Sequence, residues 1–150
     1  MIETFRPLLH AAKDLDLADP VAAERELARR FDPASPAAAE LGRELVRLLE
    51  EGKIANRGAL PVRFGRVAKA GPETAEFSID VVHMNGPGPR HRHPRGEVNF
   101  CIALDGRPTF DGHPPGWVVE PVDSTHVPTV AGGTMLIVYL LPKGEIEFLQ

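Results

Sequence analysis

Apolar side chains recur every three or four residues through the first part of the chain, which is the spacing of amphipathic helices. Thr4 stands where its side chain would cap a first helix, over residues 4–13. Asp19 followed by Pro20 predicts a second helix, over residues 20–30, because an acceptor side chain precedes a proline that the first helical turn tolerates.

A third helix is predicted over residues 36–51. Ser35 and Pro36 repeat the start signal, and Gly52 is placed to stop the helix because glycine readily takes the left-handed conformation. The helix carries a stripe of leucines at helical spacing, namely Leu41, Leu45, Leu48 and Leu49. We interpret this stripe as core packing or a dimer face rather than as part of a cofactor site.

From Gly58 onward, short β-branched and aromatic runs alternate with proline and glycine, which is typical of an all-β barrel or sandwich. Strands are predicted over residues 62–69, 76–84, 98–104, 108–110, 116–119, 126–129, 135–141 and 146–148. Residues 85–89 and 111–116 are rich in residues that favour turns, and residues 131–133 predict a further tight turn.

These elements divide the chain into a helical N-terminal segment, residues 1–60, and a β-barrel domain, residues 61–150. The expected fold is therefore mainly β with a helical N-terminal segment. A length of 150 residues is enough to bury a sizeable core, and 43% hydrophobic and 25% charged residues are ordinary for a soluble globular protein. The net charge of −4 offers no basic face to a nucleic acid.

The sequence gives no sign of export or membrane insertion. No apolar run approaches the roughly 20 residues that a membrane span needs, and the first residues lack the features of a signal peptide. Cys101 is the only cysteine, which excludes an intrachain disulfide and suits a reducing compartment. We therefore expect a cytoplasmic protein with no membrane partner.

The candidate chemistry lies in the HxHxxxE pattern formed by His91, His93 and Glu97. Side chains two residues apart on a strand project to the same side, so the two imidazoles point together. Glu97 has the same parity if the break at residues 94–96 keeps register. His126, about one hairpin downstream, is a fourth candidate. This donor set suits a divalent transition metal.

The identity of such a metal stays open. Three imidazoles and one carboxylate suit Fe(II), Mn(II), Co(II), Ni(II) or a tetrahedral Zn(II). A metal of this kind polarises a bound oxygen or lowers the pKa of a bound water. The opposing interpretation is a solvated, proline-broken loop that binds no metal.

The first motif, followed by a strand and a later strand-borne histidine, resembles the cupin superfamily over about residues 62–142. The resemblance implies a jelly-roll β-barrel and a metal bound by His91, His93, Glu97 and His126. The second motif matches only in part, since His126 comes later than the short cupin spacing predicts and the asparagine often found after that histidine is absent.

A narrower resemblance, to the 4-hydroxylaminobenzoate lyase family, covers nearly the whole chain. The runs that carry it are residues 63–69, 77–80, 86–99, 110–112, 116–119, 126–130 and 139–148. It implies conversion of 4-hydroxylaminobenzoate to 3,4-dihydroxybenzoate with release of ammonia, within nitroaromatic breakdown. Glu97 or Tyr139 would then protonate the departing group. An arginine near the cavity mouth would pair with the substrate carboxylate, and Arg90, Arg92 and Arg95 crowd the metal loop.

Two alternatives remain at this point: a cupin dioxygenase that uses Fe(II), and a non-catalytic cupin that binds a small molecule. A homodimer or a higher homo-oligomer is expected by analogy with other cupins. Asn99 and Cys101 share the parity of Glu97 and should face the barrel interior, where Cys101 would be a buried apolar residue rather than a nucleophile. His10, His83 and His113 are expected outside the metal site.

Overall fold

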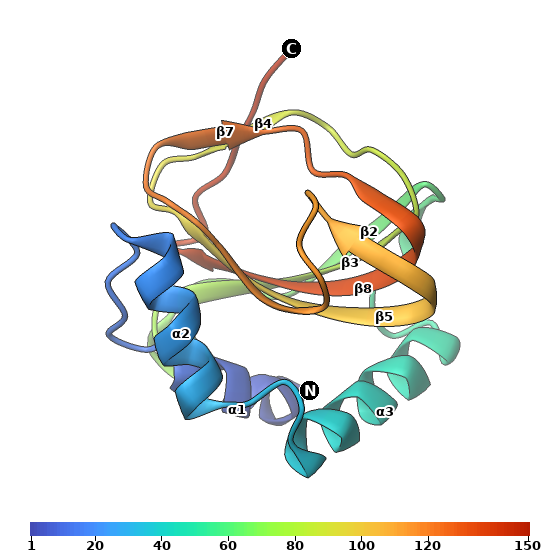
Figure 1. The fold of residues 1–150 in the computed structure, drawn as a ribbon, viewed down its shortest axis with the longest axis horizontal. Coiled ribbons are helices and arrows are strands. Elements are labelled where there is room, and N and C mark those ends of the chain that lie inside the picture. The colour runs from blue at the N-terminus through green and yellow to red at the C-terminus, as the bar shows by residue number, and fades with distance from the viewer.

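Helices come first along the chain and strands follow, in a computed structural model that describes residues 1–150 (Figure 1). The helices are α1 (Ile2–Ala12), α2 (Pro20–Arg30) and α3 (Pro36–Glu50). The strands are β1 (Arg57–Ala59), β2 (Val62–Ala68), β3 (Phe77–Met84), β4 (His91–His93), β5 (Glu97–Phe110), β6 (Gly116–Glu120), β7 (Ser124–His126), β8 (Val130–Pro142) and β9 (Glu147–Phe148). A short 3-10 helix, Pro72–Thr74, precedes β3.

The strands form two antiparallel sheets. The large sheet has six strands in the order β1-β2-β3-β8-β5-β6, and the small sheet has three in the order β7-β4-β9. The small sheet lies across one face of the large sheet, and the helices lie on the other side of the large sheet (Figure 1). The expected mainly β, jelly-roll fold with a helical N-terminal segment is confirmed. No helix of the chain is both long and apolar enough to cross a membrane.

The starts of α2 and α3 are as the sequence predicts. The Asp19 side chain accepts a hydrogen bond from the backbone N–H of Ala22, and that of Ser35 accepts one from Ala38. Gly52 ends α3 with a φ of 71°. The predicted cap at Thr4 is wrong.

Helix α1 begins at Ile2 and has no side-chain cap, so Thr4 lies inside its first turn. The physical reason is packing: the side chain of Ile2 contacts the same core as the rest of α1, which extends the helix beyond the residue suited to cap it. Burial of an apolar face contributes more to helix stability than a single cap does.

Alternation along the central strands separates two apolar layers. Val98 and Phe100 of β5 pack toward the helices, in a core shared by all three helices. Asn99 and Cys101 face the opposite side, between the two sheets, as expected from their parity with Glu97. Cys101 is 2% exposed, and burial raises the pKa of its thiol well above the usual range. It is therefore a buried apolar residue, as predicted.

Helix α2 covers strand β6, the edge of the large sheet. The indole Nε1 of Trp117 donates a hydrogen bond to the backbone oxygen of Phe31 at 2.9 Å, and both rings make edge contacts with Phe100. A carboxylate oxygen of Glu24 accepts the backbone N–H of Val119 at 2.8 Å. These contacts satisfy groups that an uncovered edge strand would leave unpaired.

Two strand predictions need correction. Residues 131–133 do not form a tight turn but belong to β8, which pairs with β5 as far as Phe110 through two register shifts. A Cβ on Gly133 would lie 2.2 Å from the backbone oxygen of Asp105, so these glycines allow close approach of two strands rather than a reversal. Strand β7 ends at His126, and residues 127–129 are not in a strand. Strand β1 was not predicted.

Candidate metal centre

Three histidines and one glutamate converge between the two sheets. His91 pairs directly with His126 across strands β4 and β7, and His93 projects to the same side of β4 as His91. Glu97 opens β5 in the large sheet, so it reaches the cluster from the opposite side. Gly96 lies in the turn between β4 and β5 with a φ of 84°, and a Cβ there would lie only 3.0 Å from the Glu120 backbone oxygen. The glycine therefore permits the turn that brings the two sheets' ligands together.

The four inward atoms have the spacing of a coordination shell. His91 Nε2 lies 2.9 Å from His126 Nε2 and 3.6 Å from Glu97 Oε2, and His93 Nε2 lies 3.2 Å from the same oxygen. Metal–ligand lengths of about 2.0–2.2 Å put neighbouring donors roughly 3–3.5 Å apart. His93 Nε2 and Glu97 Oε2 are buried without a hydrogen-bond partner of acceptable geometry. The four residues therefore fit a metal ion.

The outward nitrogens of the first two imidazoles are held by acceptors. His91 Nδ1 lies 3.0 Å from the backbone oxygen of Pro89, which can only accept a hydrogen bond. His93 Nδ1 lies 2.9 Å from Ser124 Oγ, whose own hydrogen is donated to the Pro121 backbone oxygen at 2.6 Å. Both rings therefore carry hydrogen on Nδ1 and turn the Nε2 lone pair inward, which is the tautomer that a metal ligand needs.

His126 is held more strongly, by a carboxylate. Its Nδ1 lies 2.6 Å from Asp111 Oδ2 and 3.4 Å from Glu120 Oε1. The other oxygen of Asp111 accepts the backbone N–H of Thr129 at 2.8 Å, which fixes the carboxylate in place. Burial lowers the pKa of His126, but the hydrogen bond with Asp111 and the charge of Glu120 raise it by more.

Glu97 is fully buried and oriented by a neighbour on its own strand. Asn99 donates its side-chain N–H to Glu97 Oε1 at 2.8 Å, which leaves Oε2 facing the imidazoles. Burial raises the pKa of Glu97, but the neighbouring imidazoles of His91 and His93 lower it by more and hold the pKa at about 2. The residue is therefore a carboxylate.

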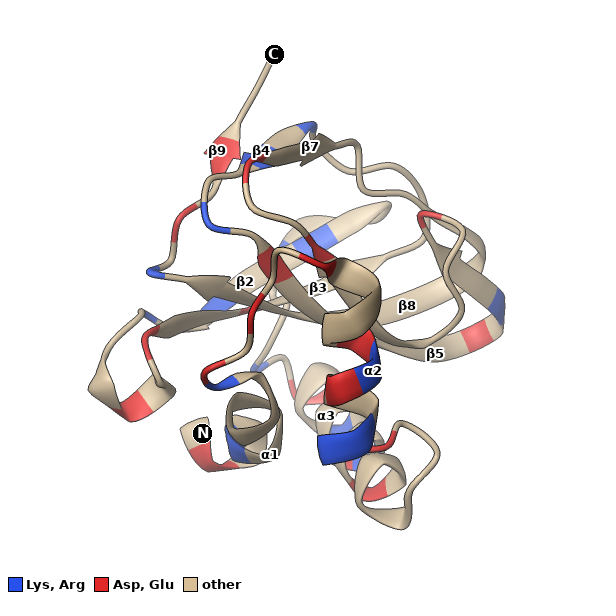
Figure 2. Cartoon of the chain, turned by 60° about the vertical axis from the view of Figure 1, so that its left-hand side comes forward, with Lys and Arg blue, Asp and Glu red and all other residues tan.

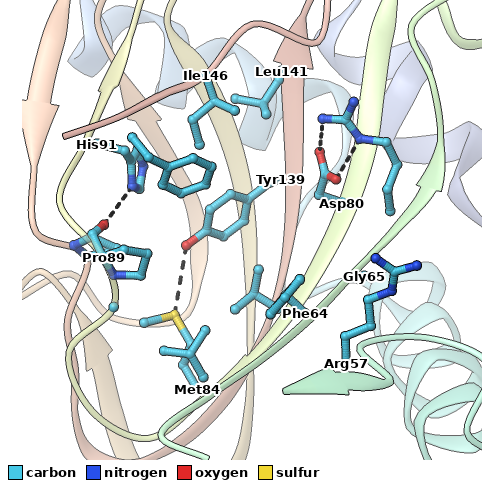
Figure 3. Close-up of a pocket in the computed structure, with 16 residues that line it drawn as sticks. Arg57, Phe64, Gly65, Asp80, Met84, Pro89, His91, Tyr139, Leu141 and Ile146 are labelled. Atoms are coloured by element: carbon cyan, nitrogen blue, oxygen red, sulfur yellow. Dashed lines mark hydrogen bonds and ion pairs between the residues drawn. The ribbon is translucent and has the colours of Figure 1, made fainter. Parts of the chain in front are cut away.

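An apolar cavity of about 580 Å³ opens beside the cluster and includes His91 in its wall (Figure 3). Tyr139, from β8, also lines this cavity, and its hydroxyl lies 3.8 Å from Met84 Sδ. Burial and the charge of Glu97 raise the pKa of Tyr139 well above its usual range. The phenol is therefore protonated and can donate a hydrogen bond into the cavity.

The arginines of the metal loop point away from the cavity. Arg92 pairs with Asp123 and Glu147, so the basic segment of β4 lies beside the acidic segment of β9 (Figure 2). Arg95 pairs with Glu145 at 3.1 Å. Neither these two residues nor Arg90 lines the cavity.

The arginines that do line the cavity are Arg57 and Arg66, which the sequence reasoning missed. They lie on β1 and β2, at the far edge of the large sheet from β6. His10 and His113 are exposed, and they lie outside the cluster together with His83.

A helix-backed jelly-roll barrel with an HxHxxxE motif and a further histidine converging between its sheets is a cupin. Residues 4–148 match the family described as "PnbB: 4-hydroxylaminobenzoate lyase", and the chain belongs to this family.

Two curated relatives carry the name 4-hydroxylaminobenzoate lyase. The one from Pseudomonas putida is 28% identical over 143 residues, which span 83% of this chain and 81% of the relative. The one from Nocardioides sp. (strain LMS-CY) is 32% identical over 94 residues, 57% of this chain and 56% of the relative. Among solved structures, an RmlC-like cupin protein from Ralstonia eutropha is 18% identical, with a TM-score of 0.45 over 61% of this chain and 62% of that one.

Proposed function

We propose that this protein is a metal-dependent lyase that converts 4-hydroxylaminobenzoate, or a related aromatic hydroxylamine, to 3,4-dihydroxybenzoate and ammonia. The observation that carries the proposal is the convergence of four donor atoms, from three buried residues and the partly buried His126, beside an apolar cavity in a chain of this family. Two of these atoms have no hydrogen-bond partner. The names and family of the relatives support the substrate class.

The reaction balances with water as the only co-reactant. The N–O bond of the hydroxylamine, the C–N bond to the ring and one ring C–H bond break, and the ring gains two C–O bonds. The nitrogen is reduced to ammonia by the same two electrons that the ring loses. No external oxidant is needed, which separates this reaction from that of a dioxygenase.

The proposed ligands are His91, His93, Glu97 and His126, which present Nε2 or Oε2 atoms to a common point. Their donor set suits an Fe, Mn, Co, Ni or Zn ion. When bound, such an ion supplies Lewis acidity toward a substrate or water oxygen. The backbone of Pro89 and the side chains that hold the outward nitrogens fix the ring orientations.

The acid that protonates the departing group has two candidates, Glu97 and Tyr139. Glu97 is 0% exposed and does not line the cavity, whereas Tyr139 does. We therefore assign Glu97 to the metal and give Tyr139 the role of proton or hydrogen-bond donor to the substrate. The apolar walls around Tyr139 limit access of water to the reacting atoms.

The test of the proposed function is product analysis with metal-loaded protein and 4-hydroxylaminobenzoate, with and without oxygen. We expect ammonia and 3,4-dihydroxybenzoate in equal amounts and at the same rate under both conditions. A requirement for oxygen would indicate the dioxygenase alternative. Tight binding of the aromatic compound without any product would indicate a non-catalytic cupin.

A further inference from the structure

The cavity beside the metal cluster has two chemically different ends. His91 forms part of one side, and Arg57 lies on the opposite side, where strands β1 and β2 meet (Figure 3). Between these ends lie Tyr139 and Leu141, and Figure 3 places the ring of Tyr139 in the space that separates His91 from Arg57. A ligand that spans the cavity would therefore meet imidazole at one end and guanidinium at the other.

Only one of the two guanidinium groups in the cavity wall is neutralised. Arg66 makes a bidentate pair with Asp80, with Nε 2.9 Å from Oδ1 and Nη2 3.2 Å from Oδ2. Asp80 is also the only carboxylate among the lining residues. Arg57 makes neither an ion pair nor a side-chain hydrogen bond with any residue of the chain. The cavity wall thus carries one uncompensated positive charge, at the end away from the histidines.

The space between the two ends suits an aromatic ring. Phe64, Val82 and Met84 contribute apolar walls, and Phe148 lies near His91, with ring centroids 5.9 Å apart. Phe64 is 48% exposed and Phe148 is 64% exposed although both line the cavity, so each offers apolar surface for a ligand to cover. Apolar walls with few polar groups at fixed points are the usual form of a small-molecule site.

We infer that Arg57 receives the carboxylate of an aromatic substrate and thereby directs the opposite end of the ring to the metal cluster. The claim about the reacting end rests on the proposed function, whereas the claim about carboxylate binding does not. The site would select aromatic monocarboxylates over uncharged analogues. It would also prefer para-substituted rings, because an ortho arrangement puts both polar groups at the same end.

The experiment uses unreactive probes and equilibrium binding to the metal-loaded protein. In the unmodified protein, 4-nitrobenzoate should bind at least about tenfold more tightly than uncharged 4-nitrobenzamide, because a charge-assisted hydrogen bond is lost in the amide. It should also bind more tightly than 2-nitrobenzoate. Arg57→Leu should weaken binding of 4-nitrobenzoate about tenfold and leave that of 4-nitrobenzamide unchanged.

Two further variants complete the test. Arg57→Lys should restore part of the affinity, since it keeps the charge but loses the planar fork. Arg63→Leu is the matched control, because Arg63 lies on the neighbouring strand β2 and outside the cavity, and it should bind 4-nitrobenzoate normally. Equal weakening of the acid and the amide by Arg57→Leu would overturn the inference. So would no weakening of either, as expected if the carboxylate binds at the histidine end.

Turnover separates this inference from the proposed function. In Arg57→Leu, we expect KM for 4-hydroxylaminobenzoate to rise about tenfold and kcat to fall, because the contact both binds the carboxylate and directs the ring to the cluster. An unchanged KM with normal ammonia release would overturn the role of Arg57 and leave the reaction standing. Charge-dependent binding without any ammonia release would support the role of Arg57 and contradict the reaction.

Discussion

Asp111 is the carboxylate that holds the imidazole of His126, and it does so from a left-handed backbone position with a φ of 49°. Asparagine tolerates that conformation, so Asp111→Asn removes the charge without straining the turn. We expect the affinity for the metal to fall about tenfold, because the orientation and basicity of His126 depend on this partner.

The affinity for the metal in Asp111→Asn is measured by competition with a chelator of known affinity. Asp123→Asn is a suitable control, since Asp123 pairs with Arg92 outside the cluster and its side chain is 67% exposed. Equal metal affinity of Asp111→Asn and the unmodified protein would show that His126 needs no such support or is not a ligand.

Tyr139 offers a second test at the level of single residues. Tyr139→Phe keeps the ring that packs 6.3 Å from Phe110 and removes only the hydroxyl. The rate of ammonia release should fall by about a hundredfold or more if the phenol assists proton transfer, while the metal content stays the same. Rates within twofold of the unmodified protein would remove Tyr139 from the chemistry.

Side-chain parity along a strand accounts for two of the four converging residues but not for the rest of the site. His91 and His93 could be grouped because strand alternation is local and fixed by backbone geometry. Glu97 reaches them from the other sheet, through the turn at Gly96, so its place depends on the fold. Arg57 could not be placed, because it reaches the cavity only through the order of strands in the large sheet. The order of strands depends on contacts between distant segments, which local patterns do not encode.

Helix α2 and strand β6 form the element pair that closes the edge of the large sheet. Trp117→Phe removes the 2.9 Å hydrogen bond from the indole to Phe31 and keeps an aromatic ring in the cluster. The free energy of unfolding, measured by chemical denaturation, should fall by about 1 kcal/mol. Metal content should not change, because Trp117 packs on the helix side of the sheet. An unaltered free energy of unfolding would mean that α2 is held by its apolar contacts alone.

The starts of α2 and α3 were predicted better than the strand ends, for a physical reason. Asp19 and Ser35 act through local hydrogen bonds to the next turn, so the sequence contains their full context. Gly132 and Gly133 were interpreted as a turn because glycine favours tight turns and also permits two strands to approach closely. The local sequence does not distinguish these two roles. Only the neighbouring strand β5 shows that close approach is the one used here.

At the scale of the whole molecule, the helices and the barrel share one apolar core. Phe5 and Leu45 from the helices belong to the same buried cluster as Val98 and Val138 from the large sheet. We therefore propose that residues 1–60 and 61–150 differ in secondary structure, helical in the first segment and β in the second. Side chains from both segments pack in the same core. Assembly into a homodimer or a larger homo-oligomer stays a prediction, which sedimentation of the purified protein would test.

The central claim is that the cluster between the two sheets binds a metal on which turnover depends. The most direct measurement is ammonia release from 4-hydroxylaminobenzoate before chelation, after chelation, and after return of each candidate divalent ion. We predict that activity disappears with the metal and returns with at least one of these ions. We also predict that His91→Ala, treated in the same way, stays without metal and without activity. Full activity in the metal-free protein would contradict the account.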